Sequence, residues 1–467
     1  MENKNENKGL GISTRSFIVA LVIIFILMCL TYALTFIIPG GEFQRKDDGN
    51  GQMIIVPDSF EHIDGGMPIW KWILSPVLVL GAEGSGTIIA VIVFLLLVGG
   101  IFNALDKSGM MKYMLNKIVA TCGHVRYRLM AIVVFFFMCM GAFIGSFEEC
   151  VPLVPIVVGL SVALGWDELT GLGMSILAIG CGFAAGVCNP FTVGVAQELA
   201  GLPMFSGMWM RLIAFVLIYS LVVLFVRNHA KKVERPIDEV AVEKSFESDR
   251  NMDIALWLFV VILGLGILLV LCSVFFPIIQ DFTMVIVALT FLVAGITSVI
   301  VAGMDVESLG KHFWNGVASI LPAVLMILMA SSIKYTLTEG NILDTLLHYA
   351  VEFANTLPQW LMIIFIYIIV LVMNFFISSG SAKAFLLIPV ILPLAQIFGI
   401  SSQLSVLAFA FGDGFSNILY PTNAVLLISL GLANVSYGKW FKWTWKLQLI
   451  ILGLTSALLL FGLAVGY

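Results

Sequence analysis

The chain has 467 residues, of which 60% are apolar and only 11% are charged, a composition far too hydrophobic for a water-soluble domain. Lys and Arg number 24 against 29 Asp and Glu, giving a formal charge of −5, so no basic excess points to nucleic acid. Apolar runs of membrane-spanning length recur along the whole chain, and this excludes a soluble enzyme with a single anchor. The remaining classes are a channel, a transporter and an intramembrane enzyme.

Nine apolar runs are long enough to cross about 30 Å of hydrocarbon as helices. They lie near residues 17–39, 87–106, 169–201, 209–227, 253–276, 282–303, 318–336, 404–434 and 444–466. Four more runs form two pairs joined by short polar tips, 129–145 with 150–164 and 360–378 with 384–398. A pair returns the chain to the side from which it entered. The predicted fold is therefore an all-α integral membrane protein with about nine transmembrane helices plus two hairpins.

The distribution of basic residues predicts the orientation, because Lys and Arg in short loops are retained in the cytoplasm. With the N-terminus inside, the inner segments hold 17 Lys and Arg and the outer segments hold three. This predicts a multi-pass protein of a bacterial-type inner (plasma) membrane, with a cytoplasmic N-terminus and the C-terminus outside. The predicted divisions are a cytoplasmic tail (1–16), a first membrane repeat (17–227), a charged cytoplasmic linker (228–252) and a second membrane repeat (253–467).

Three segments outside the spans have distinct characters. Residues 40–86 are expected to form a long outer loop. The basic segment 107–128 is expected to lie along the inner interface as a helix, and the segment 339–358, which has acidic residues and no Lys or Arg, flanks the membrane from the other side.

The two halves resemble each other. An offset of 234 residues aligns Pro155 with Pro389, and an offset of 231 aligns Pro190 with Pro421. Because the two hairpins enter from opposite sides, the halves are predicted to be inverted repeats with broken helices, the architecture of many secondary transporters. Chance similarity among Leu-rich helices is the alternative.

The tip of the first hairpin contains Ser146, Glu148 and Glu149. Adjacent helical residues diverge by about 100°, so only one of the two carboxylates is expected to face a cation, a proton or a substrate ammonium. The alternative is that both cap or solvate an ordinary loop.

The tip of the second hairpin is rich in small hydroxyl residues, with Ser379 and Ser381 preceding Lys383. Small residues let the backbone approach a ligand closely. We expect Lys383 to neutralise a carboxylate, either of the substrate or of Asp413, and the alternative is that it reaches to the membrane interface.

Each repeat contains a proline within a long apolar segment. Asn189, Pro190 and Thr192 mark the first predicted helix break, and Thr422 and Asn423 follow the proline of the second. Proline frees the carbonyl one turn earlier. Freed carbonyls and these side chains are candidates to coordinate sodium or the polar end of a substrate, although kinks for packing are the alternative.

Asp413 lies well inside an apolar span, with a glycine on each side, and Asn417 follows it on the same segment. An ionisable residue at such depth costs ~3 kcal/mol or more and marks a pathway or a coupling site. Both residues complete the predicted set of substrate- or ion-binding residues.

Four motifs carry a resemblance to a known family: GSFEECVPLVP, NPFTVGVAQ, SSGSAKAFLLIPVILPLA and GDGFSNILYPTNAVLLISLGLANVSYGKWFKW. Together they resemble the YfcC-like transporters of the C4-dicarboxylate anaerobic carrier family, within the ion transporter superfamily, over roughly Arg15 to Phe461. The resemblance implies a scaffold domain and a transport domain of two re-entrant hairpins and two broken helices, usually in a homodimer. The tips depart from the Ser-Asn-Thr tips of sodium-coupled dicarboxylate carriers.

The predicted function is secondary active transport of a small charged organic metabolite across the lipid bilayer by alternating access. Glu148, Glu149 and Asp413 face Lys383 alone, and this acidic excess favours a cationic or zwitterionic substrate. The resemblance agrees, since YfcC-like proteins are described as basic amino-acid antiporters of the arginine/ornithine type. The alternative is C4-dicarboxylate transport coupled to sodium or protons.

Other classes find no support in the sequence. The chain has no P-loop pattern, no HExxH and no GxSxG, so neither ATP-driven transport nor an intramembrane enzyme is indicated. We expect no cofactor or firmly bound metal beyond sodium or protons as the coupling ion, and no nucleic-acid partner.

Overall fold

The computed structural model describes residues 14–47, 53–82, 85–145, 147–236, 249–272, 283–354 and 357–467. This part of the chain is mostly helical, with one antiparallel two-stranded sheet. Within it, eight helical segments are long and apolar enough to cross a membrane. The predicted class of a helical, multi-pass membrane protein is confirmed. Most of the predicted tail 1–16 lies outside the described residues.

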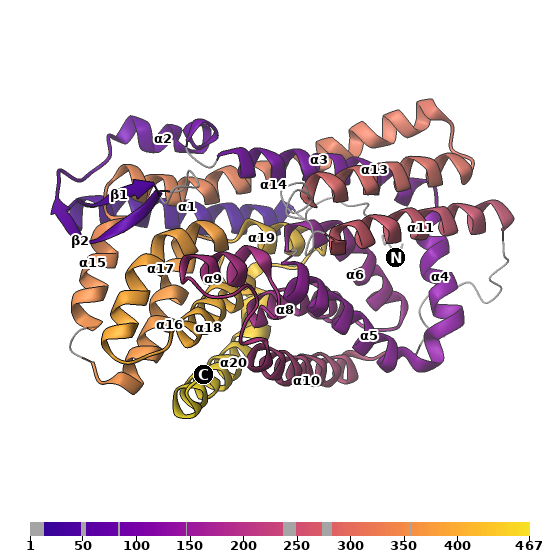
Figure 1. The fold of residues 1–467 in the computed structure, drawn as a ribbon. Helices are drawn as coiled ribbons and strands as arrows, with labels where there is room; N and C mark the ends of the chain where they lie inside the picture. Colours follow the sequence, from indigo (N-terminus) through magenta and orange to yellow (C-terminus); the bar gives the residue numbers. More distant parts are fainter. Residues whose placement is uncertain are drawn as a thin grey trace.

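The molecule has two layers of helices (Figure 1). The first layer, drawn at the top of the figure, consists of helices that pack along one another beside the second layer. Its members are α1 (Thr14–Ile37), α2 (Ile69–Leu78) with the turn η1 (Val79–Gly81), α3 (Ser85–Lys107), α11 (Arg250–Cys272), α13 (Thr283–Val301) and α14 (Val306–Glu339).

The second layer contains both predicted hairpins and both predicted broken helices. In the first repeat its members are α5 (Arg126–Cys139), η3 (Met140–Ile144), η4 (Glu148–Leu153), α6 (Val154–Ala163), α7 (Glu168–Leu172), η5 (Gly173–Leu177), α8 (Ala178–Ala185), η6 (Pro190–Gly194), α9 (Val195–Leu199) and α10 (Met208–Val233). In the second repeat they are α16 (Gln359–Phe376), α17 (Gly380–Ile397), α18 (Ser402–Gly414), η8 (Phe415–Ile418), α19 (Ala424–Leu432) and α20 (Tyr437–Val465).

The same order of elements therefore occurs twice: a helical hairpin, a helix broken near its middle, and a long final helix. The hairpin α5–α6 lies toward one end of the molecule and α16–α17 toward the other (Figure 1). This arrangement agrees with the predicted inverted repeats.

The two broken helices pack against each other closely, because a β-carbon at Gly414 of α18 would lie only 2.2 Å from the Cα of Ala184 in α8.

Two shorter helices lie across opposite ends of the bundle (Figure 1). The first, α4 (Met110–Cys122), follows the short turn after α3 and leads through η2 (Gly123–Val125) into the first hairpin. The second, α15 (Leu343–Ala354), precedes the second hairpin. Both helices fall within the segments that the sequence predicted to flank the membrane.

The expectation of an outer loop at 40–86 was wrong, because this segment folds. It contains β1 (Gly41–Asp47), β2 (Met53–His62) and then α2. The strands pair antiparallel from Gly41 opposite His62 to Asp47 opposite Met53, with an irregularity between Phe43 and Arg45. The hairpin packs on α15 and α17, so its apolar face is covered by helices that lie far away in the sequence.

The predicted linker 228–252 is shorter than expected. Helix α10 continues to Val233, and α11 begins at Arg250. Helical structure therefore enters the predicted linker from both sides, and residues 237–248 lie outside the described part of the chain.

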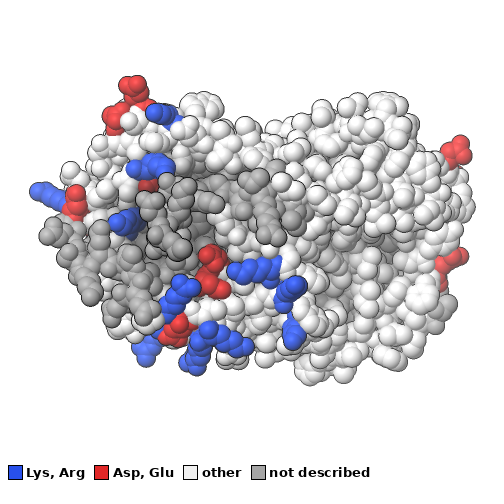
Figure 2. Space-filling model, turned by 180° about the vertical axis from the view of Figure 1, so that it is seen from behind, with Lys and Arg blue, Asp and Glu red and all other residues white. Residues whose placement is uncertain are grey.

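Charged side chains are distributed unevenly over the molecule. Figure 2, seen from behind, shows Lys and Arg, mixed with Asp and Glu, over the half that carries α4 and as far as the lower centre of the view, whereas the opposite end shows only Asp and Glu. Most of the surface between the ends shows neither kind of charge. This pattern is expected of a protein whose middle faces lipid and whose two ends face water.

Candidate functional site

The centre of the candidate site is an ion pair between Lys383 and Asp413. Lys383 lies one turn inside α17, and Asp413 lies at the end of α18, where this broken helix stops. The ammonium Nζ donates to Asp413 Oδ1, and both side chains are completely buried. Lys383 therefore does not reach to the interface, and the predicted pairing with Asp413 is what the structure contains.

A third side chain, Asn374 of α16, completes the surroundings of the ammonium. Its Oδ1 accepts a hydrogen bond from Lys383 Nζ. Its Nδ2 donates to Ser416 Oγ at 2.6 Å and to Asn417 Oδ1 at 2.9 Å. Because both protons of the amide are used on η8, its oxygen is directed toward the ammonium.

The second helix break continues this network. Asn423 donates from Nδ2 to Asn417 Oδ1 at 3.3 Å and accepts at Oδ1 from the backbone N–H of Leu426 at 3.2 Å. Asn423 is thus the N-cap of α19, which satisfies one of the free N–H groups at a helix start. The predicted residues Asn417 and Asn423 therefore contribute to the site through hydrogen bonds to each other and to Asn374.

Two buried polar atoms at the ion pair and the first break are unpaired. Asp413 Oδ2 and Thr192 Oγ1 are buried and have no hydrogen-bond partner among the described residues. Both side chains lie beside Gly380, because a β-carbon there would be 3.0 Å from Asp413 Oδ2 and 2.6 Å from the methyl carbon Cγ2 of Thr192. Buried polar atoms are normally paired, so the unpaired carboxylate oxygen is a feature that a bound donor would satisfy.

The first helix break brings the tip of the first hairpin to the same region. Gly186 and Gly145 both have positive φ, 53° and 76°, the conformation that ends a helix and favours glycine. Asn189 Oδ1 accepts from the N–H of Phe191 at 3.0 Å and caps the helix that restarts at Pro190. A β-carbon at Gly145 would lie 2.3 Å from Asn189 Oδ1, so this tip touches the break directly.

The hairpin tips from opposite ends of the molecule therefore meet at one buried region. Gly145 contacts the break at Asn189, and Gly380 contacts Thr192 in the following turn. Hairpins whose tips end inside the bundle are re-entrant, and unpaired backbone at that depth is tolerated only where it is enclosed by protein or lines a wet cavity.

Of the two predicted acidic side chains at the first tip, the structure describes that of Glu148. It lies at the start of η4, is half-buried, and its carboxylate interacts electrostatically with that of Asp413. Ser146 and the side chain of Glu149 lie outside the described residues.

Three more of the predicted residues carry hydroxyl groups. Ser379 is exposed and caps α17, with its Oγ 3.5 Å from the N–H of Ala382, and Ser381 is half-buried on the first turn. Thr422 is buried, and its Oγ1 has no partner among the described residues. Neither serine contacts the ion pair through a hydrogen bond that the structure records.

The carbonyls freed at the breaks are engaged by large side chains. Trp440 Nε1 donates to the carbonyl of Ile418 at 2.8 Å, and the Tyr437 hydroxyl donates to that of Leu419 at 2.8 Å. At the first break the guanidinium of Arg211 takes the carbonyl of Val187, with Nε at 3.1 Å. These carbonyls were candidates to coordinate sodium, and each is already the acceptor of a protein donor.

Sequence reasoning missed two residues, Asn374 and Arg211. Arg211 is fully buried and also donates from Nη2 to the carbonyls of Phe205 and Ser206, both at 3.0 Å. A cation near the C-terminal end of α8 opposes the negative pole of that helix. The signal was present in the sequence, because each residue is a lone polar group in an apolar run.

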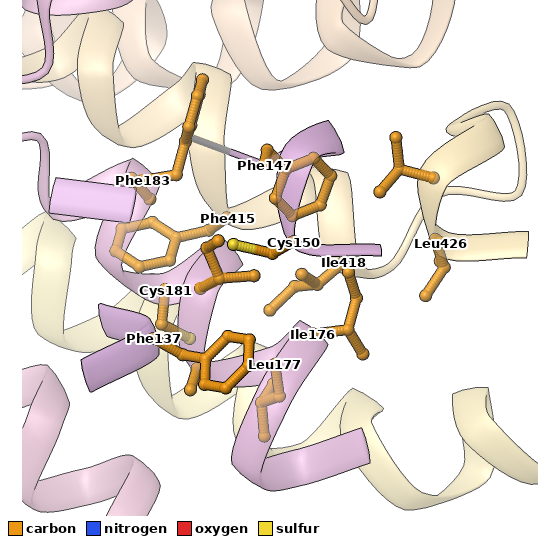
Figure 3. Packing of buried hydrophobic residues seen from close by; sticks show 14 of the residues in the cluster. Phe137, Phe147, Cys150, Ile176, Leu177, Cys181, Phe183, Phe415, Ile418 and Leu426 are labelled. Atoms are coloured by element: carbon orange, nitrogen blue, oxygen red, sulfur yellow. The ribbon is translucent and has the colours of Figure 1, made fainter. Parts of the chain in front are cut away.

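Apolar side chains of the first hairpin tip, α8 and η8 pack together in one buried cluster (Figure 3). Phe147 of the tip and Phe183 of α8 have ring centroids 6.0 Å apart. Figure 3 shows Cys150, Phe415 and Ile418 in the same cluster, and all are buried. An apolar cluster lowers the local dielectric and strengthens nearby electrostatic interactions.

Re-entrant hairpins and broken helices from two repeats, meeting at buried polar groups, define a multi-pass membrane protein of the transporter class. The chain belongs to the C4-dicarboxylate anaerobic carrier family, whose model matches residues 17–464.

Two relatives and two solved structures are similar to this chain. An Escherichia coli (strain K12) protein named "Putative basic amino acid antiporter YfcC" is 29% identical, covering 96% of each chain. An uncharacterized protein of Haemophilus influenzae is 24% identical, covering 81% of this chain and 76% of the relative.

The Alcanivorax borkumensis YdaH transporter is 19% identical over 97% of this chain and 98% of its own, with a TM-score of 0.44. Neisseria gonorrhoeae MtrF, described within a class of antimetabolite efflux pumps, is 18% identical over 94% of both chains, with a TM-score of 0.45.

Proposed function

We propose that this protein is a secondary transporter that exchanges basic amino acids of the arginine/ornithine type across the bacterial inner membrane by alternating access. The observation that carries the proposal is the buried carboxylate oxygen Asp413 Oδ2, which has no hydrogen-bond partner among the described residues. A carboxylate oxygen only accepts hydrogen bonds, so it suits an ammonium or guanidinium group, which offers only donors.

The charges of the site favour a cation over an anion. Lys383 neutralises Asp413, so this lysine is not left unpaired for an anionic substrate. Glu148 adds a carboxyl group that interacts with Asp413, and a dianion would have to lie beside both in a low dielectric. A substrate carrying a positive group suits this arrangement better.

The layered fold supplies a way to expose the site alternately. The tip segment η4 touches α3 and α13 of the first layer, and α19 touches α1 and α14. The site elements thus lie at the boundary between the layers. Movement of the second layer against the first would open the site first to one side and then to the other, as in other transporters built from inverted repeats.

Relatives support the same substrate class. The E. coli relative carries a name that describes a basic amino acid antiporter. The name of the family model instead describes a C4-dicarboxylate carrier, and a buried cation such as Lys383 is what a carboxylate of such a substrate would need. C4-dicarboxylate transport is therefore the second candidate function.

Counterflow in proteoliposomes decides between these substrates. Vesicles preloaded with ornithine or with succinate are offered labelled arginine or labelled succinate. We expect ornithine-loaded vesicles to take up arginine and Glu148→Gln to lower that uptake at least tenfold. The control is Glu198→Gln, a change at an exposed glutamate of α9, which should leave the uptake unchanged. Succinate counterflow without arginine counterflow would establish the second candidate instead.

The orientation is proposed from the charge asymmetry, with the α4 end and the N-terminus in the cytoplasm. Single cysteines at two exposed positions test it, Glu61 in β2 and Lys231 in α10. In intact cells a membrane-impermeant thiol reagent should reach position 61 but reach position 231 only after permeabilisation. The reverse pattern would invert the topology.

Cross-linking in native membranes tests the proposed homodimer.

A further inference from the structure

The ammonium of Lys383 occupies a position built from the kinds of oxygen that bind hard cations. Its two acceptors are the carboxylate oxygen Oδ1 of Asp413 and the amide oxygen Oδ1 of Asn374. Carboxylate and carbonyl oxygens are the ligands that hard metal ions prefer. They come from α18 and α16, two elements that converge in the middle of the bundle.

We propose that the Lys383 side chain is a tethered cation that holds the position of a coupling sodium ion, so that this carrier exchanges its substrates without sodium. This inference rests on the proposed transport function where it is tested by transport. It is also tested by sodium binding, which does not depend on that function.

The orientation of Asn374 is set for a cation. Its Nδ2 protons are both used, on Ser416 Oγ and Asn417 Oδ1, and Asn423 donates to the same Asn417 oxygen. The hydrogen bonds therefore run in one direction, which leaves the Asn374 oxygen as an acceptor facing Lys383. A network arranged in this way stabilises a positive charge at one point.

A free sodium ion is disfavoured at the same point. An ion that contacted both oxygens would have to take the place of the ammonium, because Lys383 Nζ already donates to Asp413 Oδ1 and to Asn374 Oδ1. A sodium site at the helix breaks would also use backbone carbonyls there, and each of these already accepts a hydrogen bond. The pairs are Val187 with Arg211, Ile418 with Trp440 and Leu419 with Tyr437. The lysine thus takes the place of the ion and also removes the need for it.

The tether has a consequence for transport. An ion that binds from solution can cross with the substrate and draw on its own gradient, whereas an ammonium attached to α17 moves only with the protein. Exchange of one monocation for another across such a site moves no net charge and does not respond to a sodium gradient.

The transport test uses the wild-type protein in proteoliposomes. Counterflow of whichever substrate exchanges is measured in sodium chloride and in choline chloride at equal ionic strength. We expect the two rates to agree within about twofold. A loss of tenfold or more in choline would overturn the proposal.

The binding test needs no substrate. Melting temperatures of purified protein in detergent are measured against sodium chloride and choline chloride for three chains: wild type, Lys383→Ala, and Lys442→Ala, a control at an exposed lysine of α20. We expect sodium to raise the melting temperature of Lys383→Ala alone, because the vacated position then accepts an ion. Adding Asp413→Asn to Lys383→Ala should abolish this rise.

A folded Lys383→Ala protein that does not respond to sodium would show that these oxygens form no cation position, and the proposal would fail. If Lys383→Ala does not fold, Lys383→Gln replaces it, because its amide retains a donor for Asp413 without the charge. A failure of arginine exchange would reject the proposed substrate while leaving this binding test intact.

Discussion

Asp344 on α15 holds Arg45 of β1 through both carboxylate oxygens, with Arg45 Nη2 3.0 Å from Oδ1 and 2.8 Å from Oδ2. The same carboxylate accepts from the backbone N–H of Phe43 at 3.0 Å. Its side chain is only 5% exposed, and the ring of Phe60 stacks on that of His348, with centroids 4.0 Å apart. The buried carboxylate of Asp344 and this aromatic contact thus hold the β-hairpin against α15.

We expect Asp344→Ala to release the hairpin from α15. Three hydrogen bonds to a charged group are lost, and each such bond contributes about 2 kcal/mol when it is well buried. Trypsin should then cleave near Arg45 at least tenfold faster. Glu42→Gln is the control, because the Glu42 carboxylate is exposed and only 3.5 Å from the same guanidinium. Equal cleavage of the two variants would show that the carboxylate does not fasten the hairpin.

The ion pair at the site should behave as a coupled unit. Removing one partner leaves an uncompensated buried charge, and in other proteins this costs about 3–5 kcal/mol. We expect Lys383→Met and Asp413→Asn each to lower the melting temperature strongly, and the double variant to recover part of the loss. A double-mutant cycle on unfolding in detergent measures the coupling. Purely additive losses would mean that the two side chains do not stabilise each other.

Sequence patterns predicted much of this site for a simple physical reason. In an apolar span, an isolated charge such as Asp413 must find a partner, and Lys383 was the single cation at the tip of the second hairpin. The prolines at 190 and 421 likewise predicted both breaks, because no continuous helix accommodates an internal proline without losing a hydrogen bond.

The residues that were missed depend on contacts between distant segments. Asn374 and Arg211 are single polar groups in apolar runs, and nothing in their neighbours shows what they bind. The segment 40–86 was predicted to be a loop, and the closest partner of its Arg45 is Asp344, about 300 positions later in the chain.

A single methyl group at Gly380 should close the site. The added carbon of Gly380→Ala would lie 2.6 Å from Thr192 Cγ2 and 3.0 Å from the unpaired oxygen Asp413 Oδ2. We expect exchange activity to fall at least tenfold while the protein still folds, because alanine favours a helix over glycine by about 1 kcal/mol. Gly438→Ala is the matched control, since Gly438 also lies in the first turn of a helix and its added carbon meets nothing within 4 Å. Full activity in Gly380→Ala would remove this position from the substrate site.

The contact between Asp167 and His229 predicts a dependence of stability on pH at the α4 end of the molecule. His229 Nε2 lies 3.0 Å from Asp167 Oδ2, and Thr170 donates its N–H and its hydroxyl to Asp167 Oδ1 at 2.9 and 2.7 Å. Burial raises the pKa of the Asp167 carboxyl, but the hydrogen bonds from His229 and Thr170 outweigh it and lower this pKa from 3.8 to about 2.

A carboxyl with a lowered pKa in the folded state stabilises the fold above the unfolded value, and that stabilisation is lost as the pH falls toward 2. We therefore expect Asp167→Asn to lower the melting temperature at pH 7 and the difference from wild type to shrink between pH 4 and pH 2. Glu168→Gln changes the net charge equally but leaves the His229 contact in place, so it should not reproduce this profile. Asp167 also caps α7, and asparagine is an equally good cap, so the variant keeps the cap. A deficit that stays constant down to pH 2 would show that the charge of Asp167 is not its cause.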